Sequence, residues 1–318
     1  MDFKAIKDFE AGNRIESFFI IKSALCKVSS TNKKYLDFTL GDKTGEINAK
    51  LWECTEEDEK NFRDNKIVKV KGTVIAWQNM LQLKVDKIRF PMEEDKVKIE
   101  DFVPSAPYPA EEMYELLNCY IEEINNNDIK NIVKSIIEEN KDKLMNFPAA
   151  MKNHHSVRSG LLYHVTTMLR AGEKLCDVYT YLNKDLLYAG IMLHDIAKLQ
   201  EMNASDLGIV SEYTIEGQLL GHIILGVEKI AMAGEKVKAD KEIVMLLKHM
   251  VLSHHYEPEY GSPKKPMIPE AEMLHYLDDM DAKMFDMQKA LRDTAGGSLS
   301  DSIWSLEKRK IYKPKVEM

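Results

Sequence analysis

The chain has 318 residues, more than most single domains, so we expect two domains, each large enough to bury a hydrophobic core. Its four cysteines are far apart in sequence, which excludes a dense disulfide scaffold and predicts free thiols in a reducing cytoplasm. The mixed-charge N-terminus and the lack of a long apolar run predict a cytoplasmic protein with no membrane segment, and the net charge of −8 argues against a non-specific coat on duplex DNA.

Residues 14–90 contain five runs of alternating apolar and polar side chains separated by turn residues, which predict five strands in a small barrel or sandwich. The inward set of the second and third strands is Leu36, Phe38, Leu40, Ile47, Ala49 and Leu51. The outward set is Tyr35, Lys50 and Trp52, followed by Lys69, Lys71, Trp77 and Lys84 on the last two strands. Rings interleaved with lysines suit single-stranded nucleic acid, because bases stack on rings and ammonium groups follow phosphates. The alternative is a solvated surface whose tryptophans pack on a neighbouring element.

Residues 91–110 are rich in proline and acidic side chains, which predicts a linker between a domain of residues 1–90 and a helical domain of residues 111–318. Residues 1–100 hold 19 basic and 18 acidic side chains, so the acidic excess lies in the rest of the chain. All nine histidines fall between residues 154 and 275. We therefore look for the chemistry of this protein in the helical part.

Helical periodicity turns several histidines toward the interior. His164 shares a face with Leu161 and Met168, and nearly every neighbour of the adjacent pair His194 and Asp195 is apolar. The next predicted stripe consists of Ile215, Leu219, His222, Gly226 and Ile230. An unpaired carboxylate at Asp195 would be costly to bury, so these positions require a partner for its charge.

Two further segments add ligand-type side chains. His254 and His255 follow an apolar helix, and the last predicted helix begins near Pro269. On that helix Asp278 and Asp281 occupy positions where a core would otherwise place leucines. Taken singly, each histidine can be a hydrogen-bonded core residue, and each aspartate can form a salt bridge with a lysine or arginine on a neighbouring helix.

The conjunction of these residues favours a metal site over separate core contacts. Several inward helices each offer His or Asp, and imidazole with carboxylate suits Mn²⁺, Fe, Zn²⁺ or Ni²⁺. Adjacent helical residues diverge by about 100°. The metal must therefore collect its remaining ligands from other helices.

The ordered set of His164, the His194–Asp195 pair and the late Asp278 resembles the H…HD…D signature of the HD-domain metal-dependent phosphohydrolases, and "HDIAK" resembles their core motif. His222 and the pair His254–His255 are similar to the extra ligands of dinuclear members. With an N-terminal segment that resembles an OB-fold and the run "NHHSVRSGLLYHV", the whole chain looks like the YhaM-type 3′→5′ exoribonucleases.

This resemblance implies a multidomain α+β protein, with a five-stranded OB-fold barrel followed by an all-α HD bundle. It implies Mn²⁺-stimulated removal of nucleotides from the 3′ end of single-stranded RNA, with single-stranded DNA as a further candidate substrate and a homo-oligomer as a candidate assembly. The implied metal ligands are His164, His194, Asp195, His222, His254, His255 and Asp278. Asp195 is expected to bridge the two ions, if two bind, and to be a catalytic residue itself.

Other residues receive supporting roles. Lys198, also expected to be catalytic, lies one turn after His194 and can hold a phosphate oxygen. Asp281 is expected to orient a ligand or water, and His155 and Arg158 are expected to contact the substrate. Two other functions stay open: an HD nucleotidase or cyclic-nucleotide phosphodiesterase with a regulatory barrel, and a non-catalytic single-strand-binding replication factor with a structural metal.

Overall fold

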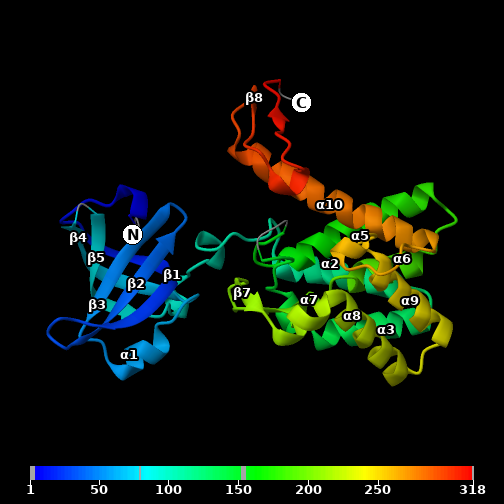
Figure 1. Ribbon diagram of the computed structural model, residues 1–318, viewed down its shortest axis with the longest axis horizontal. Coiled ribbons are helices and arrows are strands. Elements are labelled where there is room, and N and C mark those ends of the chain that lie inside the picture. The colour runs from blue at the N-terminus through cyan, green and yellow to red at the C-terminus, as the bar shows by residue number, and fades with distance from the viewer. Residues whose placement is uncertain (1–3, 79, 152–154, 317–318) are drawn as a thin grey trace. The chain divides into compact units, whose positions relative to one another are not determined.

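The computed structural model describes residues 4–78, 80–151 and 155–316. The chain divides into two compact units, Met1–Pro104 and Ser105–Met318, which we call the barrel unit and the helical unit (Figure 1). Each unit has its own cluster of buried apolar side chains. Within the described residues, no helix combines the length and the apolar character that a membrane crossing requires.

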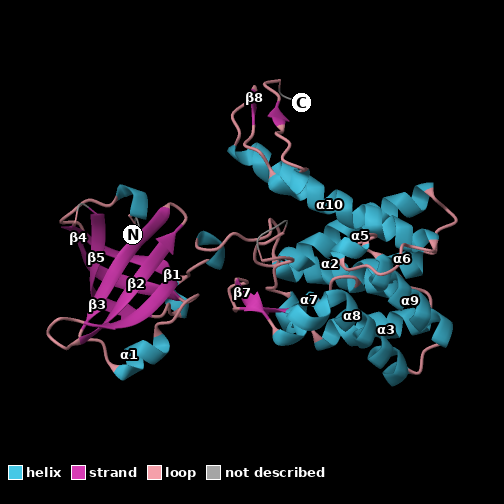
Figure 2. Cartoon of the chain, viewed as in Figure 1, coloured by secondary structure: helices cyan, strands magenta, loops and turns pink. Residues whose placement is uncertain are grey.

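The barrel unit is a closed five-stranded barrel (Figure 2). Its strands are β1 (Arg14–Val28), β2 (Lys34–Asp42), β3 (Gly45–Trp52), β4 (Ile67–Trp77) and β5 (Met80–Arg89). They follow one another around the barrel in the order β1-β2-β3-β5-β4, and β4 pairs back to β1. All pairs are antiparallel except β3 with β5. The five strands predicted from alternation are confirmed.

The inward face of the barrel is also the predicted one. Leu36, Phe38, Leu40, Ile47 and Ala49 are buried, and Leu51 packs half-buried against them. The alternation places these side chains on one face because successive strand residues point to opposite sides. A short helix that the sequence pattern did not indicate, α1 (Glu56–Asn61), connects β3 to β4 and is capped reciprocally by Thr55 and Asp58.

The helical unit is helical apart from two short sheets. Its helices are α2 (Ala110–Glu123), α3 (Asn127–Glu139), α4 (Lys141–Leu144), α5 (Gly160–Val178), α6 (Lys184–Leu193), α7 (Lys198–Glu201), α8 (Ile215–Val237), α9 (Lys241–Ser253) and α10 (Pro269–Asp293). The sheets pair β6 (Met202–Ala204) with β7 (Val210–Tyr213), and β8 (Ser298–Leu299) with β9 (Tyr312–Lys313). These strands are too short for alternation to reveal them in the sequence.

The run that contains His194 and Asp195 is two helices rather than one. α6 ends at Leu193, and residues 194–197 form a turn before α7. In this turn Lys198 N–H donates to Asp195 O at 2.9 Å, so the backbone is tighter than in a regular α-helix.

α8 is broken at Gly221, and the predicted stripe along it is wrong at its N-terminal end. Gly221 has φ 70° and ψ 161°, a conformation that strongly favours glycine. Because the break resets the helical phase, Ile215 and Leu219 are 78 % and 77 % exposed, whereas His222 is buried. Only the part of the stripe after the break faces the core.

Candidate functional site

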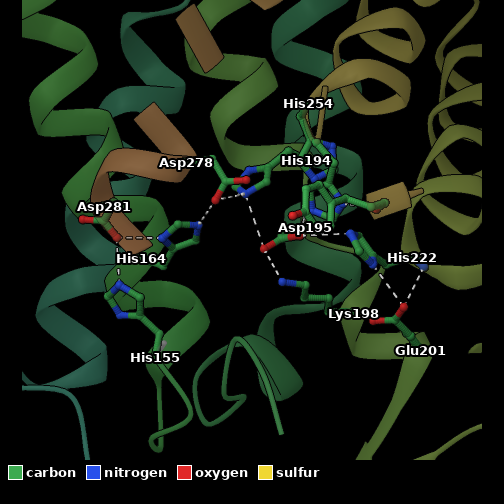
Figure 3. Close-up of polar contacts among 12 residues, drawn as sticks. His155, His164, His194, Asp195, Lys198, Glu201, His222, His254, Asp278 and Asp281 are labelled. Carbon is green, nitrogen blue, oxygen red and sulfur yellow. Dashed lines mark hydrogen bonds and ion pairs between the residues drawn. The ribbon is translucent and has the colours of Figure 1, made fainter. Parts of the chain in front are cut away.

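Four buried polar atoms converge around Asp195 without a hydrogen-bond partner in the part of the chain that the structure describes. They are His194 Nε2, Asp195 Oδ1, His222 Nε2 and His254 Nε2 (Figure 3). Asp195 Oδ1 lies 3.4 Å from His222 Nε2 and 3.9 Å from His254 Nε2, and Asp195 Oδ2 lies 3.4 Å from His194 Nε2. Each unpartnered buried polar group costs about 1–3 kcal/mol, so a cluster of four needs an explanation.

The other ring nitrogen of each histidine is fixed by an acceptor. His194 Nδ1–H donates to Ile191 O at 2.9 Å, and His254 Nδ1–H donates to Val251 O at 2.7 Å. His255 Nδ1–H donates to Tyr260 O at 2.6 Å. With the proton on Nδ1, the lone pair on Nε2 is left for a metal, which is the arrangement that ligating histidines adopt.

Glu201 orients the fourth histidine and was not identified from the sequence. Its Oε1 accepts hydrogen bonds from His222 N–H and His222 Nδ1–H, both at 3.0 Å. The break at Gly221 frees this backbone N–H, so the carboxylate caps the second half of α8 and aligns the ring at once. The available signal was an acidic residue between the apolar Leu199 and Met202 at the end of the HD run.

A second part of the site lies between α5 and α10. His164 Nε2 lies 3.2 Å from Asp278 Oδ1, and His164 Nδ1–H donates to Asp281 Oδ2 at 2.7 Å. His194 Nε2 lies 4.0 Å from the same oxygen of Asp278, which links this part to Asp195. Asp281 therefore fixes the orientation of the His164 ring, and its role behind a metal ligand stays a prediction.

His155 is buried next to Asp281 rather than placed at the surface. Its ring is 1 % exposed, donates from Nε2 to Asp281 Oδ2 at 2.8 Å, and stacks on Phe285 with centroids 4.0 Å apart. A Cβ at Gly160 would lie 2.0 Å from His155 O, so the start of α5 needs glycine to approach this residue. The predicted contact of His155 with the substrate stays a prediction. The buried ring has almost no exposed surface for such a contact.

The electrostatics of the cluster favour a cation. Burial by itself would raise the pKa of Asp195, but Lys198 and His194 lower it well below its ordinary value. Burial would lower the pKa of His164, but its hydrogen bonds to Asp278 and Asp281 raise it to about 10. Burial holds the pKa of His254 well below its ordinary value, so its imidazole is neutral. The ionised carboxylate of Asp195 and the neutral imidazole of His254, which can donate an electron pair to a metal, thus lie in one buried site.

Lys198 points into the same cluster. Its Nζ donates to Asp195 Oδ2 at 2.7 Å, and the side chain is 12 % exposed. Burial lowers its pKa, but Asp195 more than compensates and raises it above the usual value, so the ammonium stays charged. Arg158 is engaged elsewhere, because its guanidinium donates to Asp206 O on the loop between β6 and β7.

The structure therefore brings together ligand atoms from five segments. Asp195, His222, His254 and His255 offer ligand atoms within 4.8 Å of one another, and so do His164, His194 and Asp195. Asp195 belongs to both groups, with one oxygen toward each. Nitrogen and oxygen donors without cysteine sulfur fit a divalent cation of intermediate hardness. The donor set, its burial and its orphaned atoms all fit one or two such ions.

On the barrel, four of the predicted contact residues share one outward face. Tyr35 and Trp52 are paired across β2 and β3, with ring centroids 4.6 Å apart. Lys50 Nζ lies 5.5 Å from the Tyr35 ring centroid, and Lys50 is paired with Lys84 across β3 and β5. Trp52 is 44 % exposed, so its ring is available to a further stacking partner. We call Tyr35, Lys50, Trp52 and Lys84 the ring-and-lysine face.

The remaining barrel candidates lie elsewhere. Lys69 Nζ pairs with Glu16 at 3.2 Å and Asp95 at 3.6 Å, and Lys71 Nζ pairs with Glu16 at 3.7 Å, on the β1–β4 side. Trp77 ends β4 and is 60 % exposed. The acidic partners of Lys69 and Lys71 partly neutralise the charge that the sequence pattern assigned to phosphate binding.

Several relatives match nearly the whole chain. The "3'-5' exoribonuclease YhaM" of Bacillus subtilis is 40 % identical over 98 % of this chain and 98 % of its own length. The protein of that name from Bacillus velezensis is 42 % identical with the same coverage of both chains. The chain belongs to the YhaM family.

Family models agree with the two units. An OB-fold nucleic acid binding domain matches residues 21–90, and an HD domain matches residues 161–283. Among solved structures, a domain of replication protein A from Methanococcus maripaludis matches with a TM-score of 0.24 at 25 % identity, covering 27 % of this chain and 91 % of that chain. The expected OB-fold barrel and helical HD domain are confirmed, and with the HD domain a dependence on divalent metal.

Proposed function

We propose that this chain is a metal-dependent 3′→5′ exoribonuclease that hydrolyses single-stranded RNA to nucleoside 5′-monophosphates. The observation that carries the proposal is the convergence of His194, His222 and His254 on Asp195 with their Nε2 atoms unpartnered and buried. Membership of the YhaM family supports the reaction and the direction of attack.

In this proposal His164, His194, Asp195 and Asp278 hold one cation, and Asp195, His222, His254 and His255 hold a second. Divalent ions so held supply Lewis-acid stabilisation of the phosphate in its transition state and lower the pKa of a water ligand. We propose Mn²⁺ as the resident ion, as the resemblance to the YhaM-type enzymes implies. Imidazole and carboxylate donors without thiolate suit Mn²⁺, and they also suit Fe, Ni²⁺ and Zn²⁺.

The protein's own groups position and neutralise the reacting phosphate. Asp195 presents one oxygen to each group of histidines, which places its charge between the two cation sites. Lys198, now 2.7 Å from Asp195, is the cation that can turn to a non-bridging phosphate oxygen once the carboxylate is shared with metal. Glu201 and Asp281 keep His222 and His164 in the required tautomer and orientation.

In this proposal the barrel binds the substrate and takes no part in the chemical step. The ring-and-lysine face offers a stacking platform and two ammonium groups, a combination that binds single strands with little dependence on sequence. We propose that it holds the RNA upstream of the 3′ end. Lys69 and Lys71 are left out of this face, because their ammonium groups already pair with carboxylates. We also propose a cytoplasmic location, where RNA is the substrate and the free thiols stay reduced.

The test incubates 5′-labelled single-stranded RNA with the protein in Mn²⁺ or EDTA, beside the Asp195→Ala variant. We expect a ladder that shortens from the 3′ end only with metal and unchanged protein. An oligomer left intact with every divalent metal tried would refute the proposal. Single-stranded DNA of the same sequence tests the second substrate, and light scattering tests self-association.

The same assay separates the two alternatives. A nucleotidase or cyclic-nucleotide phosphodiesterase would turn over mononucleotides and leave the labelled oligomer at full length. A non-catalytic single-strand-binding factor would bind the oligomer equally well after Asp195→Ala and give no product with Mn²⁺.

A further inference from the structure

The C-terminal segment of the helical unit has the opposite charge from the rest of that unit. Residues 302–316 contain four lysines, one arginine and one glutamate, whereas residues 105–301 contain 20 basic and 31 acidic side chains. A polyanion is repelled by the net negative charge of residues 105–301 and attracted by the net positive charge of this segment. The composition alone is compatible with a solvated surface, so its structure decides what the segment can do.

The segment folds as a hairpin at the C-terminal end of α10. β8 pairs with β9, Ile303 bridges to Arg309, and the buried Leu306 anchors the turn between them. Lys313 Nζ donates to Leu291 O in the last turns of α10 at 2.7 Å. Figure 1 shows this hairpin at the end of α10, away from the helices that surround the metal-site residues. We call residues 298–313 the C-terminal hairpin.

Two cations of the hairpin, Lys308 and Lys310, are available to a ligand. Lys308 and Lys310 are exposed, and none of the basic residues from 308 to 315 forms an ion pair with another described residue. By contrast, Lys27, Lys33 and Lys34 on the barrel each pair with a carboxylate. Lys308 and Lys310 therefore carry charge that no carboxylate among the described residues neutralises.

Two aromatic rings accompany these cations. Trp304 is 77 % exposed and Tyr312 is 55 % exposed. A hollow of about 500 Å³ opens between the end of α10 and the hairpin, with Trp304, Asp293 and Asp301 in its wall. Carboxylates would repel a phosphate but accept N–H groups, so the hollow suits a base while the lysines suit the backbone. Exposed rings beside unpaired cations are the combination found on the barrel face as well.

We propose that the C-terminal hairpin is a second binding site for single-stranded RNA, several nucleotides upstream of the 3′ end that is cleaved. This inference rests on the proposed function for the identity of the strand. Fifteen residues of α10 separate Asp278 from Asp293, and at about 1.5 Å per residue they span about 22 Å. At about 3.4 Å per stacked nucleotide, this distance corresponds to about six nucleotides. A dinucleotide bound at the metal site is too short to reach the hairpin.

The test compares the full-length protein with the Lys308→Glu/Lys310→Glu variant and with Trp304→Ala. The matched control is Lys174→Glu/Lys241→Glu, which makes the same change of charge at exposed positions of the same unit. Binding of a fluorescein-labelled 20-nucleotide RNA is measured by anisotropy in EDTA over a range of salt concentrations. Hydrolysis of a dinucleotide is measured separately with Mn²⁺.

We expect the lysine variant to bind the long RNA about 5- to 10-fold more weakly than the control, with a salt-dependence slope smaller by about 1.4, which is about 0.7 for each lost phosphate contact. Trp304→Ala should weaken binding without changing the slope, and dinucleotide hydrolysis should be unchanged in both. Equal affinity and slope in variant and control would overturn the inference. Unchanged affinity with an altered elution volume would also overturn it, and would make the hairpin a contact between copies of the chain. Absence of hydrolysis by the unaltered protein would contradict the proposed function instead, while the binding comparison still decides the hairpin.

Discussion

In the helical unit the polar side chains of the site are buried and point at one another, whereas on the barrel they are exposed and point outward. His194, His222 and His254 surround Asp195 with unpartnered Nε2 atoms; Asp278 lies 4.0 Å from His194 Nε2, and Glu201 is bound to the other ring nitrogen of His222. On the barrel, Trp52 is exposed, Lys50 is half-buried beside the Tyr35 ring, and Lys69 already has acidic partners. Buried groups without partners indicate where a ligand must complete the structure, and exposed groups indicate only where one can attach.

This difference sets the size of the expected effects. Removing a group from the buried cluster disturbs several fixed distances at once, because each residue there contacts two or more others. Removing an exposed side chain of the barrel loses one contact with a flexible single-stranded RNA. Changes in the helical unit should therefore affect the chemical step, and changes on the barrel should affect binding.

The largest effect is expected for Asp278→Asn, which should slow 3′ shortening of RNA by more than about 100-fold, beyond the 10- to 100-fold typical for residues that only support metal ligands. The carboxylate lost here lies 3.2 Å from His164 Nε2. The control is Asp279→Asn, whose carboxylate pairs at the surface with Lys283 and should not matter. Equal rates in the two variants would show that α10 does not face the reaction.

A smaller effect is expected for Glu201→Gln, which should weaken Mn²⁺ binding by about 10- to 100-fold in calorimetric titrations. The amide retains an oxygen for His222 but loses the charge that strengthens the imidazole as a donor. Glu212→Gln, at an exposed position of β7, provides the comparison. A Kd for Mn²⁺ that matches this control would mean that His222 does not bind the ion.

On the barrel, Trp52→Ala should weaken binding of single-stranded RNA by about 1–3 kcal/mol, because one stacking surface is lost. Dinucleotide hydrolysis should keep its rate, since no upstream base is present to use the ring. Val28→Ala removes an exposed apolar side chain from β1 and should change neither quantity. A loss of dinucleotide hydrolysis in Trp52→Ala would contradict the proposal that the barrel binds the RNA while the helical unit alone carries out hydrolysis.

The smallest effect distinguishes two lysines that look alike in the sequence. Lys50→Ala should lower the slope of log affinity against log salt by about 0.7, whereas Lys71→Ala should leave it unchanged. Lys71 already pairs with Glu16 at 3.7 Å, and Lys50 lies over the Tyr35 ring instead. Equal slopes for the two variants would mean that the ion pair at Glu16 does not keep Lys71 from phosphate.

Periodicity was sufficient for much of the architecture. Period-two alternation identified the strands and placed Phe38 and Ala49 inside the barrel, because a strand exposes every second residue to the same side. Helical spacing placed His164 and Asp278 inward on two distant helices, and the structure brings them to 3.2 Å. Periodicity is sufficient where burial of a face depends only on the local repeat.

It failed where the backbone departs from that repeat. The turn of residues 194–197 and the break at Gly221 are local departures from the helix that no stripe reveals, and the break leaves Ile215 exposed. Glu201 escaped notice for the same reason, because its role depends on a backbone N–H that only a broken helix leaves free.

The sequence by itself determined that the chain has a strand-rich unit and a helical unit, that the histidines belong to the second, and that a buried aspartate there needs a cation. Only the tertiary structure decided which groups meet: that Asp195 offers one oxygen to each set of histidines, that Glu201 holds His222, and that Lys69 faces Glu16 rather than solvent. The physical reason is that side-chain periodicity depends on the local backbone, whereas the partner of a polar group depends on segments far away in the chain.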